Sequence, residues 1–486
     1  MLASTDLIWG PFRVSGQFAT NHFLVTGTTG SGKTTLVEVL LSTALSSAAD
    51  YYSVRALMYD PKQEMIPYLD GLGLFDRVRI LHPFDERRLA WDLSKDFDDP
   101  ISCRELAGIL IPKNAAVSPE GSFFDSACRQ IVADVATALS YSRPKIESWS
   151  LRDLILICLD RKHLSRFVES SSHDALRRSY DAYLNSKTTD SRTSSNVFAS
   201  LYAHLARFEP IAQSWHLASK SYSIQQWMKS TGEIIVLGSD TAADETIGAL
   251  NRAFIQRWIQ VVLQGKEQRT GDSSYCQSWL VLDELRELGQ IQGLGSFMTK
   301  SRSRGGVAVL SFQAVDGLYH IYGREQANEI VANFSNVAVL KTASPSTAEW
   351  AAGLFGKVLV EELQETEGMA SEGLSRSFTR VKHERSVVMT GDLLSFALPT
   401  QSQALEGLFR VATSDNQNPH RRVNWGKLLE LKAVASSLEG YLEMDRRGLL
   451  IERLGLADEH RLGLVEEANN PTAQADTAKS LQDIGE

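Results

Sequence analysis

The feature that most constrains this chain is the segment 27–34, which reads Gly-Thr-Thr-Gly-Ser-Gly-Lys-Thr. It matches the GxxxxGK[ST] pattern of a phosphate-binding loop. Its glycines allow the backbone to fold around an anion and to direct N–H groups inward. A buried strand is expected at 22–26 and a helix at 34–49, whose positive end adds to the attraction for phosphate. The sequence therefore predicts a nucleoside triphosphate site rather than an incidental glycine-rich turn.

The residue types in this loop also predict which ligands it holds. Lys33 is expected to reach the β- and γ-phosphates of ATP, and the Thr34 hydroxyl is expected to ligate Mg²⁺. The residues expected to contact the nucleotide are Gly27, Thr28, Thr29, Gly30, Ser31, Gly32, Lys33, Thr34 and Thr35.

A second motif is the apolar run 279–282, which ends in the two carboxylates Asp283 and Glu284. In ATPases with a phosphate loop, the first carboxylate of such a pair holds the Mg²⁺ shell. The second can act as the general base for the attacking water. Many strands end in acids simply because their ends are solvated, but the pairing with a phosphate loop favours catalysis. We expect Asp283 to act with Thr34 on the metal, and Glu284 to be the base.

Two further expected strands end in polar residues. Gln313 follows an apolar run at 308–312, and Asp60 follows the strand at 54–59 within the sequence Asp-Pro-Lys. The carboxyl ends of parallel strands share one edge of a sheet, where ligands bind. Gln313 is therefore expected to sense the γ-phosphate, and Asp60 to contact the water network of the site. A polar strand cap and a simple turn are the alternative interpretations.

Three basic residues, Lys300, Arg302 and Arg304, lie at a spacing of two. On a helix, Lys300 and Arg304 would share a face and Arg302 would point to the opposite side. Gly305 and Gly306 predict the end of that helix. One of these cations could contact the nucleotide of a neighbouring subunit as an arginine finger. The alternative is a solvated basic helix end that the helix dipole stabilises.

The chain as a whole predicts an α/β fold, because short apolar strands alternate with helices and imply a mostly parallel sheet covered on both faces. Helical patterns replace this alternation in the middle of the chain, and residues 357–390 predict an extended hairpin. The expected parts are a nucleotide-binding core at 1–100 and 229–430, an inserted all-α domain at 101–228, a C-terminal helical segment at 431–465 and an acidic, disordered tail at 466–486.

Composition limits the cellular setting. Four cysteines without CxxC spacing argue against zinc and redox sites and favour a reducing cytoplasm. No signal peptide and no apolar run of about 18 residues are found, so we expect a soluble protein. The net charge of -9 argues against DNA wrapped around the outer surface, but it does not exclude a narrow basic pore.

From about residue 20 to 415, the chain resembles the type IV coupling proteins of conjugation and type IV secretion. Besides the phosphate loop and Asp-Pro-Lys, the resemblance rests on Leu-Asp-Glu-Leu-Arg-Glu-Leu-Gly at 282–289, Thr-Lys-Ser-Arg-Ser-Arg-Gly-Gly at 299–306, Ser-Phe-Gln at 311–313 and Leu-Tyr-His-Ile-Tyr-Gly at 318–323. It implies a RecA-like core and a ring, usually of six subunits, that uses ATP to move DNA or a nucleoprotein. It also implies that Arg302 acts in trans and that the all-α domain meets cargo such as a relaxase.

Members of that family usually begin with a membrane anchor, and residues 1–26 contain no segment that can span a bilayer. We therefore expect a cytoplasmic protein that a separate inner-membrane partner could attach. Three functions stay open at this point. They are a coupling-protein motor acting on DNA or a relaxase–DNA complex, a soluble FtsK/HerA-like DNA pump in mobile-element processing or defence, and an ATP-gated cargo-recruitment module that moves no DNA.

Overall fold

The structure is a computed structural model of the 486-residue chain. It describes residues 6–46, 53–112, 119–142, 148–185, 187–268, 275–370, 373–400, 404–412 and 419–464. The expected acidic tail at 466–486 lies outside the described residues. The chain divides into two compact units, of which the first comprises Met1–Arg88 with Ile224–Glu443, and the second Leu89–Ser223 with Met444–Glu486.

The first unit is built on a nine-stranded sheet with the order β15-β14-β11-β3-β10-β9-β4-β8-β5. All neighbours from β11 to β5 pair in parallel, while β14 and β15 add antiparallel strands at one edge. The bounds are β3 (Phe23–Thr26), β4 (Ser53–Asp60), β5 (Val78–Ile80), β8 (Ile234–Gly238), β9 (Cys276–Leu282), β10 (Gly306–Phe312), β11 (Asn336–Leu340), β14 (Leu405–Arg410) and β15 (His420–Val423). The mostly parallel sheet agrees with the predicted strand pattern.

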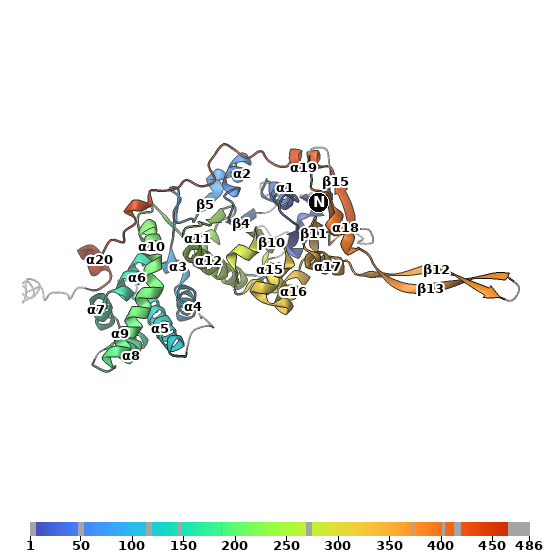
Figure 1. The fold of residues 1–486 in the computed structure, drawn as a ribbon. Helices are drawn as coiled ribbons and strands as arrows, with labels where there is room; N and C mark the ends of the chain where they lie inside the picture. Colours follow the sequence, from blue (N-terminus) through green and yellow to red (C-terminus); the bar gives the residue numbers. More distant parts are fainter. Residues whose placement is uncertain are drawn as a thin grey trace, which may run out of the picture. The chain divides into compact units, whose positions relative to one another are not determined.

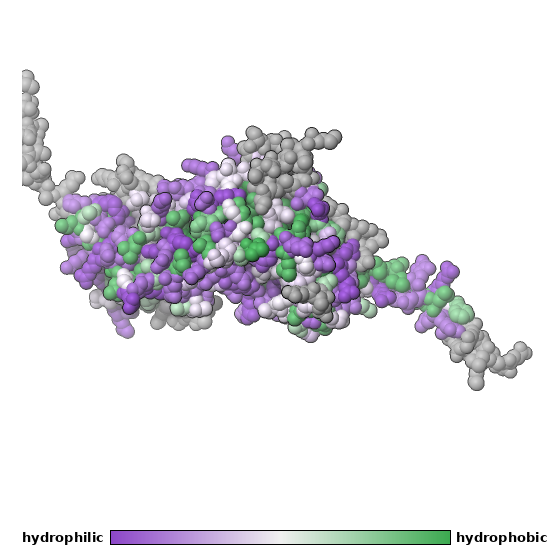
Figure 2. Space-filling view, turned by 90° about the horizontal axis from the view of Figure 1, so that it is seen from above, coloured by the Kyte–Doolittle hydropathy of each residue, from purple (hydrophilic) through white to green (hydrophobic). Residues whose placement is uncertain are grey.

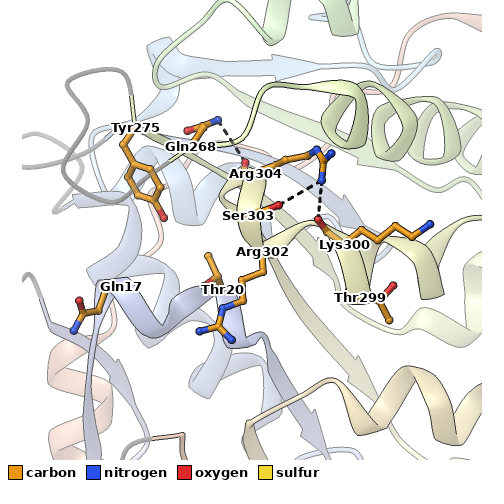
Figure 3. A pocket seen from close by; sticks show the side chains of 9 residues that line it. All are labelled: Gln17, Thr20, Gln268, Tyr275, Thr299, Lys300, Arg302, Ser303 and Arg304. Atoms are coloured by element: carbon orange, nitrogen blue, oxygen red, sulfur yellow. Dashed lines mark hydrogen bonds between the residues drawn. The ribbon is translucent and has the colours of Figure 1, made fainter.

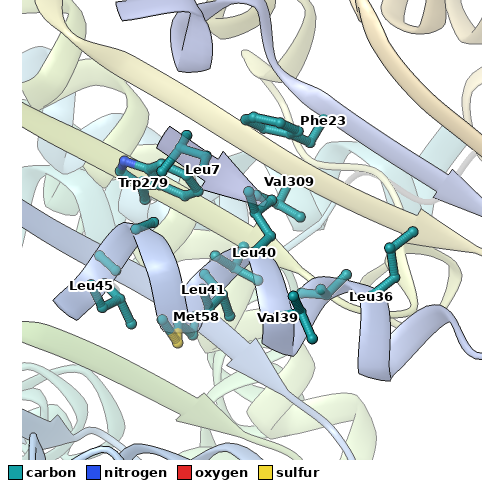
Figure 4. Packing of buried hydrophobic residues seen from close by; sticks show 14 of the residues in the cluster. Leu7, Phe23, Leu36, Val39, Leu40, Leu41, Leu45, Met58, Trp279 and Val309 are labelled. Carbon is teal, nitrogen blue, oxygen red and sulfur yellow. The ribbon is translucent and has the colours of Figure 1, made fainter. Parts of the chain in front are cut away.

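Helices lie on both sides of this sheet. In Figure 1, α1 (Lys33–Ser46) and α2 (Met65–Gly71) lie on one side. On the other side lie α12 (Asp244–Gln264), α15 (Val315–Tyr322), α16 (Arg324–Ala332) and α17 (Pro345–Gly353). Apolar side chains of α1, including Leu36 and Leu40, form one buried cluster with Phe23, Trp279 and Val309 of the sheet (Figure 4). Burial of each such side chain contributes about 1.5–3 kcal/mol, which fixes α1 on the sheet directly after the phosphate loop.

The predicted hairpin is confirmed. Strands β12 (Lys357–Ala370) and β13 (Gly373–Ser386) pair with each other in antiparallel fashion, and among the described strands they join no other. Leu359, Leu363 and Phe378 are about two-thirds exposed on it, at 67%, 67% and 65%. Figure 1 shows the hairpin at the right, and Figure 2 shows hydrophobic residues among hydrophilic ones along it.

The second unit consists mainly of helices. They are α3 (Leu93–Asp96), α4 (Pro100–Leu110), α5 (Pro119–Tyr141), α6 (Leu151–Leu159), α7 (Arg161–Ser170), α8 (Asp174–Tyr183), α9 (Ser191–Leu205), α10 (Glu209–His216) and α20 (Leu456–Arg461). The division falls earlier than the expected limits of 101 and 228, and the second unit includes a parallel pair of short strands, β6 (Ala90–Trp91) and β7 (Ser221–Tyr222). This pair also departs from a purely helical insertion.

The expected C-terminal segment 431–465 is shared between the two units. Its part up to Glu443 belongs to the first unit, and the part from Met444 belongs to the second. Within the second unit, Asp458 of α20 accepts a hydrogen bond from Arg152 of α6 at 3.0 Å. Within the described residues, we find no helix that combines the length and the apolar character required to cross a membrane.

Candidate nucleotide-binding site

The phosphate loop joins β3 to α1 and requires glycine at three positions. Gly30 and Gly32 have φ values of +75° and +96°, in the region that strains side chains of L-residues. A Cβ atom on Gly27 would lie 2.6 Å from Ser31 Oγ and 2.9 Å from Leu340 Cβ. The backbone therefore has the tight curvature that the sequence pattern predicts.

Lys33 is the first residue of α1, and its ammonium group lies over the loop. Its Nζ atom donates hydrogen bonds to the carbonyl oxygens of Gly27 at 2.7 Å and Thr28 at 3.1 Å. The residue is 6% exposed. Burial lowers the pKa of Lys33, and the carboxylates of Glu284 and Asp283 partly offset that effect. A poorly hydrated cation at the start of a helix is the group expected to attract a polyphosphate.

The two predicted carboxylates stand at the end of β9 and have different surroundings. Asp283 Oδ2 accepts a hydrogen bond from Lys62 Nζ at 3.2 Å, whereas the buried Oδ1 atom has no hydrogen-bond partner among the described residues. Glu284 has φ +60°, a left-handed conformation that is costly for a residue with a side chain. Backbone strain of this kind, of about 1–3 kcal/mol, concentrates at functional sites, where it serves to aim a side chain.

Gln313 connects the acidic pair to the phosphate loop. Its Nε2 atom donates to Glu284 Oε1 at 3.0 Å, and its Oε1 atom accepts from Thr29 Oγ1 at 3.4 Å. The strand order explains this position, because β10 lies between β3 and β9. The carboxyl end of β10 therefore lies between the phosphate loop, which follows β3, and the two carboxylates, which follow β9. The prediction that these residues meet at one sheet edge agrees with the structure.

At the end of β4, Lys62 takes the position in which we expected Asp60. The Asp60 carboxylate accepts hydrogen bonds from the backbone N–H groups of Glu64 at 3.1 Å and Met65 at 2.8 Å, at the start of α2. Burial raises the pKa of Asp60 to about 6. Lys62 instead contacts Asp283 and lies 3.9 Å from Glu284. Although burial opposes it, these carboxylates raise the pKa of Lys62. The Asp-Pro-Lys turn was the available signal for this residue.

These residues surround a pocket of about 660 Å³. Its walls come from the loop and the start of α1, from Lys62, Glu284 and Gln313, and from a segment that follows the last strand of the sheet. That segment contributes Trp425, Lys432 and Ala435, none of which belongs to a recognisable motif. Sequence reasoning missed them because only the fold brings them to the site.

Arg302 lies elsewhere. The helix α14 (Leu294–Lys300) ends before it, and Arg302–Arg304 form a 3-10 turn, so the predicted continuous helical face is wrong. Arg304 is tied to its own chain by hydrogen bonds from Nε to Gly265 O at 3.1 Å and from Nη1 to Lys300 O at 3.2 Å. Arg302 and Lys300 are exposed and line a second pocket of about 590 Å³, in which their side chains point in different directions (Figure 3).

The second pocket lies near the amino end of β10, whereas the phosphate loop follows the carboxyl end of the neighbouring strand β3. Arg302 precedes the amino end of β10, and Gln313 follows its carboxyl end. The seven residues of β10 span about 23 Å at 3.3 Å per residue. Arg302 therefore does not join Lys33, Asp283, Glu284 and Gln313 in the pocket of its own chain.

Together, fold and site define an α/β P-loop NTPase with an additional helical unit. Residues 11–423 match the family described as the type IV secretion-system coupling protein DNA-binding domain, and the chain belongs to this family. The predicted family is thereby confirmed. The coupling protein TraD of Escherichia coli (strain K12) is 22% identical over 365 residues, which cover 73% of this chain and 46% of TraD. The chain thus spans about half the length of this relative.

Solved structures of a similar fold support the predicted fold class. The bacterial conjugative coupling protein TrwBdeltaN70 in its unbound monoclinic form is 21% identical, has a TM-score of 0.67, and the match covers 91% of this chain and 92% of that chain. The plasmid coupling protein TrwB in complex with ADP and Mg²⁺ is 21% identical with a TM-score of 0.67, covering 91% and 93%. The α/β P-loop fold with a helical unit is therefore confirmed.

Proposed function

We propose that this chain is a subunit of an ATP-hydrolysing motor of the coupling-protein type, which moves DNA or a relaxase–DNA complex. The observation that carries the proposal is the connection of Glu284, Gln313 and Thr29 by two hydrogen bonds. These bonds link Glu284, the candidate general base, to the phosphate loop through the side-chain amide of Gln313. Family membership supports a role in DNA transfer, and TrwB has been seen with ADP and Mg²⁺ and with a non-hydrolysable ATP analogue.

The residues present fit ATP and Mg²⁺ on their chemistry. Four buried polar atoms lack a hydrogen-bond partner among the described residues and lie on the loop or at the ends of β3, β9 and β10: Thr26 Oγ1, Ser31 Oγ, Asp283 Oδ1 and Ser311 Oγ. Each such atom costs about 1–3 kcal/mol unless a polar ligand or water satisfies it. We assign the phosphates to Lys33 and the loop N–H groups, and the metal to Thr34 and Asp283. When bound, Mg²⁺ would neutralise charge on the β- and γ-phosphates.

The remaining side chains then have distinct tasks. Glu284 orients the attacking water and accepts its proton. Gln313 holds the Glu284 carboxylate through its amide N–H. Because Gln313 also contacts the phosphate loop, this hydrogen bond would depend on the nucleotide that the loop holds. Lys62 restrains both carboxylates and compensates part of their charge. Because Arg302 does not face the site of its own chain, we assign it to the nucleotide of the adjacent subunit in a ring, which we propose to be hexameric.

The family also suggests roles for other parts of the chain. We propose that the helical unit contacts cargo such as a relaxase, and that a separate membrane protein can hold the motor at the inner membrane. An FtsK/HerA-like pump would use the same site without such a partner, so co-purification with a membrane protein or relaxase separates the two functions.

DNA should stimulate the ATPase. We expect turnover to rise when single- or double-stranded DNA is added to the purified chain with ATP and Mg²⁺. The stimulation should fall with added salt, because phosphate contacts depend on counterion release. A coupled assay of ADP production over a salt series measures both effects, with Lys33→Ala as the inactive control. Unchanged turnover with both DNA forms would refute a DNA motor and favour a cargo-recruitment module.

A further inference from the structure

The segment that follows β15 is fixed on the helix of the phosphate loop. Lys432 Nζ forms an ion pair with Glu38 Oε2 at 2.6 Å, and the Glu38 side chain on α1 is buried. Ser42 of the same helix donates to the carbonyl oxygen of Leu431 at 3.3 Å. Loss of the partly exposed Lys432 ammonium would be costly, because the buried Glu38 carboxylate would remain unpaired. The segment from Trp425 to Lys432 is thereby held in one position over α1.

Trp425 begins the helix α19 (Trp425–Leu431) in this segment and lies against the phosphate loop. Asn424 caps the helix by accepting a hydrogen bond from Lys427 N at 3.0 Å, which fixes the first turn. Two atoms of the indole ring lie 3.1 and 3.3 Å from the place where a Cβ of Gly32 would be. The ring is half-buried and lines the 660 Å³ pocket. Among the described residues that line this pocket, Trp425 is the aromatic one.

The strand order places Trp425 on the side of the loop away from the catalytic groups. Gly32 is close to both Trp425 and Leu405, the first residue of β14. From β3, the strand β14 is reached through β11, whereas Gln313 and Glu284 follow β10 and β9 on the other side. A nucleotide is an elongated molecule. If its terminal phosphate faces Glu284, its base extends away from that residue, toward the wall that Trp425 forms.

We propose that Trp425 is the base-contacting residue of the nucleotide site, and that the Glu38–Lys432 pair positions it. This inference rests on the proposed function, since it presupposes that the pocket holds a nucleotide. The chemistry fits, because a nucleobase presents a π face and gains affinity by stacking on an aromatic ring. The family match ends at residue 423, so the proposed contact comes from the segment that follows the matched residues.

A comparison of two ligands tests the proposal. Mg²⁺–ADP contains a base and Mg²⁺–pyrophosphate does not, so isothermal titration of both on the full chain separates base contacts from phosphate contacts. Trp425→Ala is expected to weaken ADP binding roughly 5- to 150-fold, the range found when a base loses an aromatic stacking partner. Pyrophosphate binding should stay unchanged, and Trp425→Phe should retain most of the ADP affinity. Leu429→Ala, on the same helix but outside the pocket lining, is the matched control.

Each other outcome has a defined meaning. Equal weakening of both ligands in Trp425→Ala would overturn the proposal, because the indole would then only support the loop through Gly32. Unchanged ADP binding would overturn it as well. If the Lys33→Ala variant binds both ligands as tightly as the wild-type chain, the nucleotide site itself is refuted, and the base contact with it. Loss of ADP affinity in Lys432→Ala, with pyrophosphate binding retained, would support the positioning role of the ion pair.

Discussion

Replacement of Glu284 by Gln should preserve nucleotide binding and lower the turnover of ATP roughly 100- to 10,000-fold, the usual contribution of a general base. Glutamine keeps the shape of the side chain and can still accept a hydrogen bond from Gln313, so the local structure should persist. It cannot accept a proton from water at neutral pH. Single-turnover measurements with saturating ATP, together with a binding titration, separate the two effects.

The control for this experiment is Glu287→Gln, which removes the same charge three residues later. Glu287 is exposed and does not line the nucleotide pocket. Its replacement should leave turnover close to that of the wild type. If Glu284→Gln turns over ATP at the normal rate, Glu284 is not the base. If both variants lose activity equally, the effect comes from the net charge near the site rather than from the chemistry of Glu284.

Removal of the Arg302 side chain is expected to lower the turnover of ATP at least as much as Glu284→Gln does. An arginine finger that stabilises the transferring phosphoryl group contributes roughly 1,000-fold or more to turnover. Arg302→Ala should therefore reduce steady-state ATP hydrolysis by that order and leave binding of the nucleotide intact, because the residue lies at the far end of β10 from its own phosphate loop. Lys300→Ala, which alters the same second pocket, is expected to have a small effect.

Mixing two inactive chains decides whether Arg302 acts across the subunit interface. In mixed rings of Arg302→Ala and Lys33→Ala chains, some sites combine an intact loop with an intact arginine from the neighbour. Partial return of ATPase activity is expected on mixing, with a maximum at intermediate ratios. Activity that stays at the sum of the two separate variants would mean that Arg302 serves its own subunit or only maintains structure.

The part of this site that the sequence predicted is the part that follows strand ends. Gly27 to Thr34, Asp283, Glu284 and Gln313 each come directly after an apolar run, and parallel strands bring such positions to one edge. The strand runs themselves were recognisable because both faces of the sheet are buried. Nothing in the local sequence distinguished Asp60 from Lys62 at the end of β4, since the two residues share one turn. Only burial and the start of α2 commit the Asp60 carboxylate to backbone N–H groups.

Contacts made by residues that no motif and no strand end marks were beyond prediction from the pattern. Trp425 and Lys432 reach the pocket because β14 and β15 return the chain to the edge of the sheet and the Glu38 carboxylate fixes it there. The turn at Arg302 was predicted as helix because Gly305 and Gly306 mark an end without showing where it begins. In the structure, the backbone N–H of Arg304 donates to Ser301 O at 2.9 Å, an i→i−3 bond that closes the tighter 3-10 turn. The short β6–β7 pair carries too few residues for a periodic signal.

If hydrolysis at this site moves DNA, the chain should displace an obstacle that is bound to the DNA. A duplex that carries a triplex-forming oligonucleotide and a single strand with a terminal streptavidin block serve as the two substrates. We predict that the wild-type chain displaces at least one of these obstacles in the presence of ATP, and that Glu284→Gln displaces neither. Hydrolysis of ATP by the wild type at a DNA-stimulated rate, with both obstacles left in place, would show that this chain does not move DNA.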